Sequence, residues 1–128
     1  MARASVHDRL RHVLDEIALI RSFVAERSRD DHRQMPMLRR AVERSLEIIS
    51  EATRHIPAPM RAAHPEIPWR SVADIGNVLR HGYDQIADDR IWMVVEQNLD
   101  PLEWAVRSML ADDEKRLAGD GAAGQSDR

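Results

Sequence analysis

The residues with the clearest chemical potential lie together between positions 77 and 84. This segment contains an amide at Asn77, a guanidinium at Arg80, an imidazole at His81 and a phenol at Tyr83, with Gly82 between the last two. Asn77 and His81 are four residues apart and therefore share one face of a helix. An imidazole can act as a general acid or base near neutral pH, and a guanidinium can stabilise charge on phosphate oxygens. The segment could therefore bind a phosphate and transfer protons.

The same segment also has a purely structural interpretation. His81 and Tyr83 could cap the end of a helix, and Arg80 could pair with Asp84. Clusters of this kind are common at helix ends, so the spacing by itself does not identify a catalytic site.

A second set of residues could in principle form a metal site. Glu43, Glu47, Glu51 and His55 follow one another at four-residue intervals. Metal-binding bundles use a Glu-x-x-His pair on each of two helices, whereas the spacing here is four and no second motif exists. We interpret this ladder as a solvated helix face and predict neither a metal nor a cofactor. The six histidines also lack metal-ligand spacing, and each isolated one is expected at the surface.

Four helices are predicted to position these groups, because apolar residues recur every three or four positions along the chain. Pro57 ends the second helix, and a proline-rich, extended connection over 57–68 follows it. Asp88 and Asp89 cap the fourth helix at its positive end, and Pro101 predicts a kink or weak break within it. The predicted helices cover approximately residues 6–27, 35–56, 69–81 and 88–110.

These helices and their mostly short connections predict an all-α fold, an antiparallel four-helix bundle. The bundle is expected to occupy residues 1–112, followed by a disordered tail over 113–128. Trp69 is expected to anchor the proline-rich connection on the bundle. We also predict a homodimer, because the second and fourth helices carry more apolar surface than a small bundle can bury, and Trp92 and Trp104 add to it.

Composition and charge narrow the class of protein further. The chain has 128 residues, no cysteine, 43% hydrophobic residues and a formal charge of −3. Disulfides and thiolate chemistry are therefore excluded. Residues 1–40 carry a net charge of +3 and residues 71–128 a net charge of −6, which disfavours general coating of DNA but leaves room for a local anion site. No long apolar run or signal core occurs, so we expect no membrane span and a cytoplasmic protein.

Four segments carry a resemblance to a known family. They are residues 11–17 (RHVLDEI), 40–52 (RAVERSLEIISEA), 67–70 (IPWR) and 75–84 (IGNVLRHGYD). In combination they resemble the HepT-like ribonucleases, which belong to the HEPN superfamily of helical-bundle toxins. The resemblance extends over roughly residues 10–110.

The sequence departs from the family pattern at one position. That pattern is an arginine, four to six arbitrary residues, a histidine, one further residue and a tyrosine. His81 and Tyr83 match its second half, but positions 74–76 contain no arginine. Arg80 resembles a variant of the family and is a candidate substitute, although neighbouring helical positions point about 100° apart. Arg70 is a second candidate through space.

The resemblance implies a toxin that acts as a homodimeric, metal-independent endoribonuclease on RNA, including tRNA. It also implies a nucleotidyltransferase antitoxin that transfers AMP to the motif tyrosine, Tyr83. On this basis His81 is the general acid or base, Arg80 and Asn77 are the other catalytic residues, and Arg70 and Tyr83 contact the substrate. The expected reaction is attack of a ribose 2′-hydroxyl on the adjacent phosphate, which leaves a cyclic phosphate.

Two alternatives remain open at this point. The missing arginine favours a catalytically inactive interaction protein that keeps the fold and binds the nucleotidyltransferase partner. A plain helical adaptor unrelated to RNA would require the resemblance to be accidental.

Overall fold

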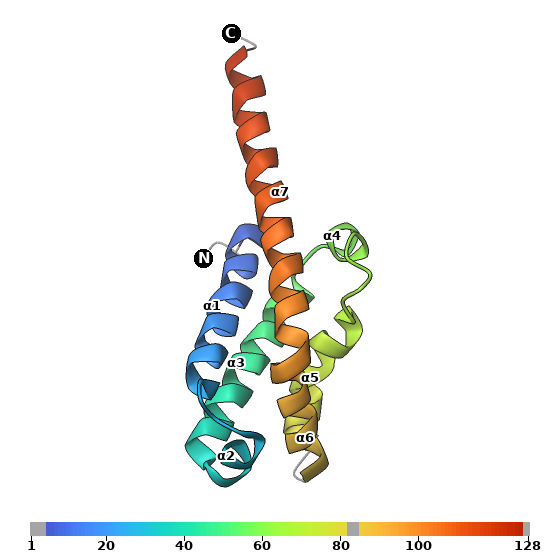
Figure 1. The fold of residues 1–128 in the computed structure, drawn as a ribbon. Helices are drawn as coiled ribbons and strands as arrows, with labels where there is room; N and C mark the ends of the chain where they lie inside the picture. Colours follow the sequence, from blue (N-terminus) through green and yellow to red (C-terminus); the bar gives the residue numbers. More distant parts are fainter. Residues whose placement is uncertain (1–4, 82–84, 127–128) are drawn as a thin grey trace.

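The computed structural model describes residues 5–81 and 85–126, and within these ranges the chain is helical with no β-strand. This result confirms the all-α prediction. Four helical rods form an antiparallel bundle, in which α3 packs against both α1 and α5, and α7 packs against α1 (Figure 1). The helices are α1 (Val6–Val24), α2 (Arg29–Gln34), α3 (Pro36–Arg54), α4 (Ala58–Ala62), α5 (Trp69–His81), α6 (Gln85–Met93), the π-helix η1 (Val94–Asn98) and α7 (Leu99–Ser126).

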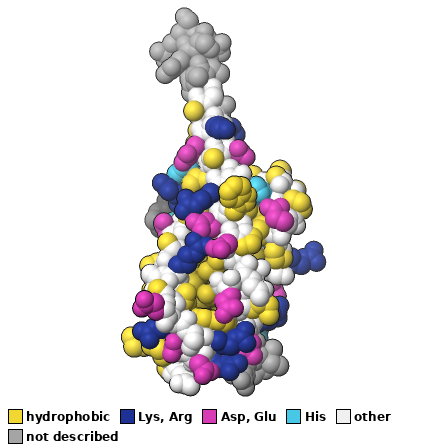
Figure 2. All heavy atoms as spheres, in the orientation of Figure 1, with side chains coloured by type: hydrophobic (Ala, Val, Ile, Leu, Met, Phe, Trp, Pro, Cys, Tyr) yellow, Lys and Arg dark blue, Asp and Glu magenta, His cyan; other side chains and the backbone are white. Residues whose placement is uncertain are grey.

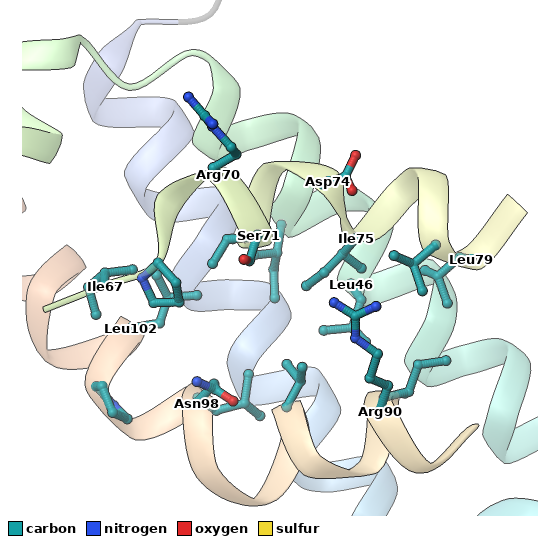
Figure 3. Close-up of a pocket in the computed structure, with 18 of the residues that line it drawn as sticks. Leu46, Ile67, Arg70, Ser71, Asp74, Ile75, Leu79, Arg90, Asn98 and Leu102 are labelled. Carbon is teal, nitrogen blue, oxygen red and sulfur yellow. The ribbon is translucent and has the colours of Figure 1, made fainter. Parts of the chain in front are cut away.

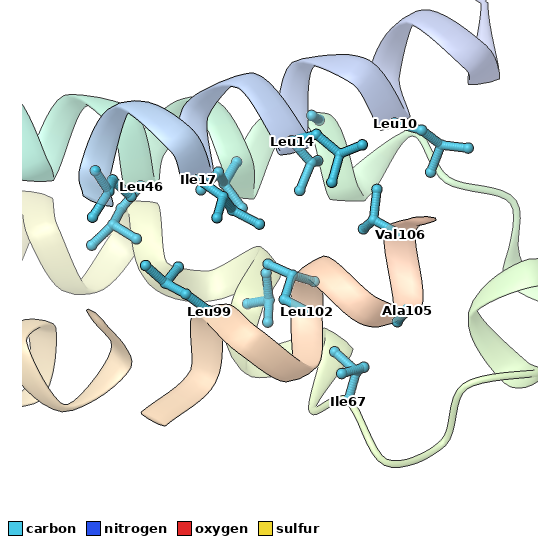
Figure 4. Close-up of a cluster of buried hydrophobic side chains, with 14 of the residues drawn as sticks. Leu10, Leu14, Ile17, Leu46, Ile67, Leu99, Leu102, Ala105 and Val106 are labelled. Atoms are coloured by element: carbon cyan, nitrogen blue, oxygen red, sulfur yellow. The ribbon is translucent and has the colours of Figure 1, made fainter. Parts of the chain in front are cut away.

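The core is made from the apolar stripe of each long helix. Leu10 and Ile17 of α1, Leu46 of α3 and Val106 of α7 are at most 1% exposed and lie along the interior of the bundle (Figure 4). Burial of apolar surface stabilises this arrangement by about 25 cal/mol per Å². On the outer surface, acidic and basic side chains are interspersed (Figure 2). None of the helices within the described ranges is long and apolar enough to cross a membrane.

Two short helices were not expected from the sequence. α2 forms where a connector was expected, because Ser28 and Asp31 make a reciprocal capping box at its N-terminus. α4 lies within the connection over 57–68, so the expectation of an extended connection is wrong for residues 58–62. Its proline lies in the first helical turn, where a missing N–H costs nothing.

The fourth predicted helix is formed by α6, η1 and α7, which follow one another without a gap. The break expected at Pro101 takes the form of the π-helical turn η1, which ends at Asn98, shortly before the proline. Proline has no N–H for the carbonyl four residues earlier, and a wider turn accommodates this loss. α6 already begins at Gln85, three residues before the predicted cap.

α7 continues as a helix to Ser126, where a disordered tail over 113–128 is expected from the sequence (Figure 1). Residues 111–118 are rich in Ala, Glu, Lys, Arg and Leu, all strong helix formers. Arg116 and Asp113 add a pair across one turn at 3.2 Å. The boundary of the folded domain at residue 112 stays a prediction.

Candidate functional site

The helix that carries the candidate site, α5, is fixed to α3 through one backbone carbonyl. Ser50 Oγ donates to the carbonyl oxygen of Ala73 at 2.7 Å, and Arg54 donates to the same oxygen from Nε and Nη2 at 3.1 and 2.7 Å. Gly76, one turn further along α5, is buried against Ser50. These contacts fix the position of α5 along α3 and leave the opposite face of α5 exposed.

Three side chains form a hydrogen-bonded ladder along the exposed face of α5. Asn77 Nδ2 donates to Asp74 Oδ1 at 2.8 Å, and Arg80 Nη2 donates to Asn77 Oδ1. The residues are spaced by three, so each lies about one helical turn beyond the last. The ladder orients both the amide of Asn77 and the guanidinium of Arg80. His81, the last residue of α5, is exposed beside it.

The guanidinium of Arg80 lies back over Gly76. A Cβ atom added at Gly76 would be 3.7 Å from Arg80 Nη1 and 3.8 Å from Ser50 Oγ, which are ordinary contact distances. Position 76 is one of the three at which the family pattern places its arginine. Arg80 therefore brings a guanidinium to the place on α5 where the side chain of residue 76 would begin.

The structure brings together only part of the predicted site. Asn77 and Arg80 are hydrogen-bonded, and His81 follows directly. Arg70 lies in the first turn of α5, about 15 Å along the helix axis from Arg80, so it is not part of this cluster. Tyr83, together with its neighbours Gly82 and Asp84, lies outside the described residues.

A groove of about 340 Å³ lies between α5 and the α6–η1–α7 rod, next to this cluster (Figure 3). Its floor is apolar and includes Leu46, Ile75 and Leu102. Arg90 extends across it from α6 toward α5, and the amide of Asn98 lies on the opposite wall from α5. No local pattern predicts this groove, because its walls come from segments that are distant along the chain.

The row of glutamates on α3 is not uniformly exposed to solvent. Glu43 is partly buried, and burial raises the pKa of its carboxyl group. Glu51 is exposed, and a hydrogen bond from His55 Nε2 at 3.1 Å lowers the pKa of its carboxyl group. Among the residues that the structure describes, no group of three or more histidines and carboxylates is placed to hold a metal ion.

The structure confirms the role expected of Trp69 and corrects the expectation for one histidine. Trp69 Nε1 donates to the carbonyl oxygens of Arg61 and His64, both at 2.9 Å, which confirms its anchoring role. Trp92 is only 4% exposed, so it belongs to the interior of the bundle, whereas Trp104 is 72% exposed. His32 is 0% exposed, so the expectation that every isolated histidine lies at the surface is wrong.

Comparison with known proteins gives a consistent result. A sequence model described as Ribonuclease HepT-like matches residues 13–109. A candidate RNase of Caldanaerobacter subterraneus subsp. tengcongensis is 34% identical over 101 residues, covering 79% of this chain and 90% of the relative. The probable ribonuclease HepT of Thermococcus cleftensis is 34% identical over 101 residues, covering 79% of this chain and 92% of the relative. No solved structure matches the chain.

Proposed function

The chain belongs to the ribonuclease HepT-like family, and we propose that it is a metal-independent endoribonuclease and the toxin component of a toxin–antitoxin system. The observation that carries the proposal is the ladder that orients Asn77 and Arg80 next to the exposed imidazole of His81. This set offers a proton-transfer group beside a guanidinium held in place by hydrogen bonds. RNA cleavage needs these two functions. We further propose that the enzyme acts in the cytoplasm, on RNA that includes tRNA.

The proposed reaction uses the RNA's own 2′-hydroxyl as nucleophile. His81, acting as general base, removes the proton of this hydroxyl, and the oxygen attacks the adjacent phosphorus. The bond from phosphorus to the 5′-oxygen breaks, and that oxygen takes up a proton from the solvent. The products are a 2′,3′-cyclic phosphate and a 5′-hydroxyl. The charge that develops on the phosphate oxygens is stabilised by a guanidinium in the cluster.

Arg80 is the proposed source of that guanidinium. Its side chain reaches back over Gly76, and Asn77 holds it through a hydrogen bond. Asp74 in turn orients the Asn77 amide. Arg70, at the other end of α5, is proposed to contact RNA away from the scissile phosphate.

Moving the arginine tests this assignment. Arg80→Ala should lower the rate of RNA cleavage by about 10²–10³-fold, the usual effect of losing one donor to a developing oxyanion. Restoring an arginine at the earlier position, in Gly76→Arg/Arg80→Ala, should recover most of the rate. Arg11→Ala, an exposed arginine on α1, is the control for the change in net charge. Full activity in Arg80→Ala would exclude Arg80 from the site.

The proposed partner is a nucleotidyltransferase antitoxin that transfers AMP to Tyr83. Each AMP would add about one negative charge close in sequence to Arg80 and His81, where RNA phosphate must bind, and would also obstruct the site. Mass spectrometry of the chain co-expressed with such a partner should show AMP on the wild type and none on Tyr83→Phe. Unmodified wild type, or modification that persists in Tyr83→Phe, would remove Tyr83 as the control point.

A homodimer is part of the proposal. Trp104 is 72% exposed, and Leu19 and Met93 are 45% and 47% exposed, which is apolar surface that a second copy could cover. The groove between α5 and the α6–η1–α7 rod adds to this apolar surface. Sedimentation should therefore show a dimer at micromolar concentration, and a monomer would contradict this part of the proposal.

An inactive interaction protein is the second candidate, because positions 74–76 contain no arginine. It keeps the fold and the nucleotidyltransferase partner but does not cut RNA. Purified, unmodified wild-type protein that leaves total RNA intact while still binding the partner would favour this candidate.

A further inference from the structure

His32 is a polar residue in an unusually buried position. The side chain is 0% exposed, and neither ring nitrogen has a hydrogen-bond partner among the residues that the structure describes. A neutral imidazole carries one donor and one acceptor, so both stay unsatisfied in this site. Buried polar atoms in proteins almost always have partners, and an exception of this kind calls for a physical reason.

The site of His32 is the contact between α2 and α6. The imidazole packs against the indole of Trp92, with ring centroids 5.4 Å apart and planes inclined by 47°. One residue further along α2, Arg33 Nη2 donates to Asp89 Oδ1 at 2.6 Å. Among the residues that the structure describes, a ring contact and an ion pair therefore connect these two helices.

Protonation of His32 would place a cation in this enclosure. Burial lowers the pKa of the imidazole; the carboxylate of Asp88 on α6 opposes this shift, and the guanidinium of Arg39 on α3 adds to it. Asp89 is occupied by Arg33, and Glu96 accepts a hydrogen bond from Trp92 Nε1. The other charged side chains at this end of the bundle include Asp30 and Asp31 of α2 and Glu43 of α3.

We propose that His32 is a pH-operated latch between α2 and α6. In its neutral form the imidazole stays against Trp92 and holds α2 closed on α6. Once protonated, it gains more from hydration than from this enclosure, so the side chain leaves the site and α2 separates from α6.

α2 can move as a local unit. It has only six residues, it follows Glu26 in a left-handed backbone conformation (φ 61°), and Pro36 begins the next helix. Short segments with few buried contacts open at a lower free energy than the core helices. α6 begins at Gln85, four residues after His81. The latch itself does not depend on the ribonuclease proposal.

The test is a pH titration of the full chain by NMR at fixed protein concentration, which follows the histidine rings and the exchange of backbone amides. His32 should titrate below the ordinary pKa of an imidazole. Amide protection in α2 and in residues 88–93 should fall by up to about tenfold per pH unit below about pH 6.5, while α1 and α3 stay protected. In His32→Leu this dependence should disappear, because the imidazole that takes up the proton is absent; His12→Gln is the matched control and should behave as wild type.

Three results would overturn the latch. The first is a His32 that titrates at or above the ordinary pKa of an imidazole. The second is protection that falls equally in all helices, which indicates global unfolding. The third is a pH dependence of α2 and α6 that persists in His32→Leu. If His32→Leu does not fold, the wild-type titration still decides between the latch and global unfolding.

Discussion

The contact between α3 and α5 can be tested by removing its two donors separately and together. Ser50 and Arg54 both donate to the carbonyl oxygen of Ala73. In Ser50→Ala the carbonyl keeps the Arg54 donors, and in Arg54→Met it keeps the Ser50 hydroxyl. Neither single change leaves this oxygen without a side-chain donor, whereas the double change removes both.

The expected losses of unfolding free energy follow from the sharing of one carbonyl oxygen by two donor residues. Ser50→Ala should lower the free energy of unfolding by about 1 kcal/mol, the usual net value of one hydrogen bond. Arg54 is 43% exposed, so Arg54→Met should also cost only about 1 kcal/mol. The double variant should cost about 3 kcal/mol, because the desolvation of the carbonyl is then no longer compensated. This corresponds to a melting temperature lower by roughly 12 °C in a domain of this size.

Urea unfolding of the four proteins at one pH and one protein concentration measures these values as a double-mutant cycle. Fixed concentration is needed because a homodimer gains stability by mass action. Arg44→Met, on the exposed face of α3, is the control and should change the free energy of unfolding by no more than about 0.5 kcal/mol. Strictly additive costs, or a single variant as damaging as the pair, would refute the shared-acceptor explanation.

Three further predictions concern other parts of the fold. Trp69→Phe removes the N–H that bonds two carbonyls of the α4 connection, so urea unfolding should show a loss of about 1–2 kcal/mol. The backbone N–H of Ser28 donates to Asp31 Oδ2 at 2.8 Å, which lowers the pKa of Asp31. The resulting stability is present above the unfolded pKa of about 4 and is lost as the pH falls through the lower folded pKa, so circular dichroism of Asp31→Asn should lack this acid step. Trp104→Glu should shift the sedimentation equilibrium toward monomer while leaving helicity unchanged.

Periodicity predicted the bundle because each long helix buries one face. The stripe that contains Leu46 and the stripe that contains Val106 were both visible in the sequence, and both lie in the core. Pro101 predicted the local break, since the loss of one N–H is a property of the residue itself. α2 was missed although its capping box could have revealed it, because six residues are too few for a periodic pattern.

The candidate site was only partly readable from the sequence. The three-residue spacing of Asp74, Asn77 and Arg80 allows the ladder, but the direction in which Arg80 folds over Gly76 depends on its side-chain torsions. The burial of His32 depends on the packing of α2 against α6, whose residues are more than fifty positions apart along the chain. Contacts of this kind have no local signature.

The most direct test of the proposed function is RNA cleavage by purified chain that is free of partner and unmodified at Tyr83. Wild type and His81→Ala are incubated with total RNA and with tRNA in the presence of a metal chelator, and the ends of the products are identified. The proposal predicts cleavage by the wild type with 2′,3′-cyclic phosphate ends, and a rate about 10²–10⁴-fold lower in His81→Ala at unchanged helicity. Intact RNA with the wild type, or equal cleavage by His81→Ala, would contradict it.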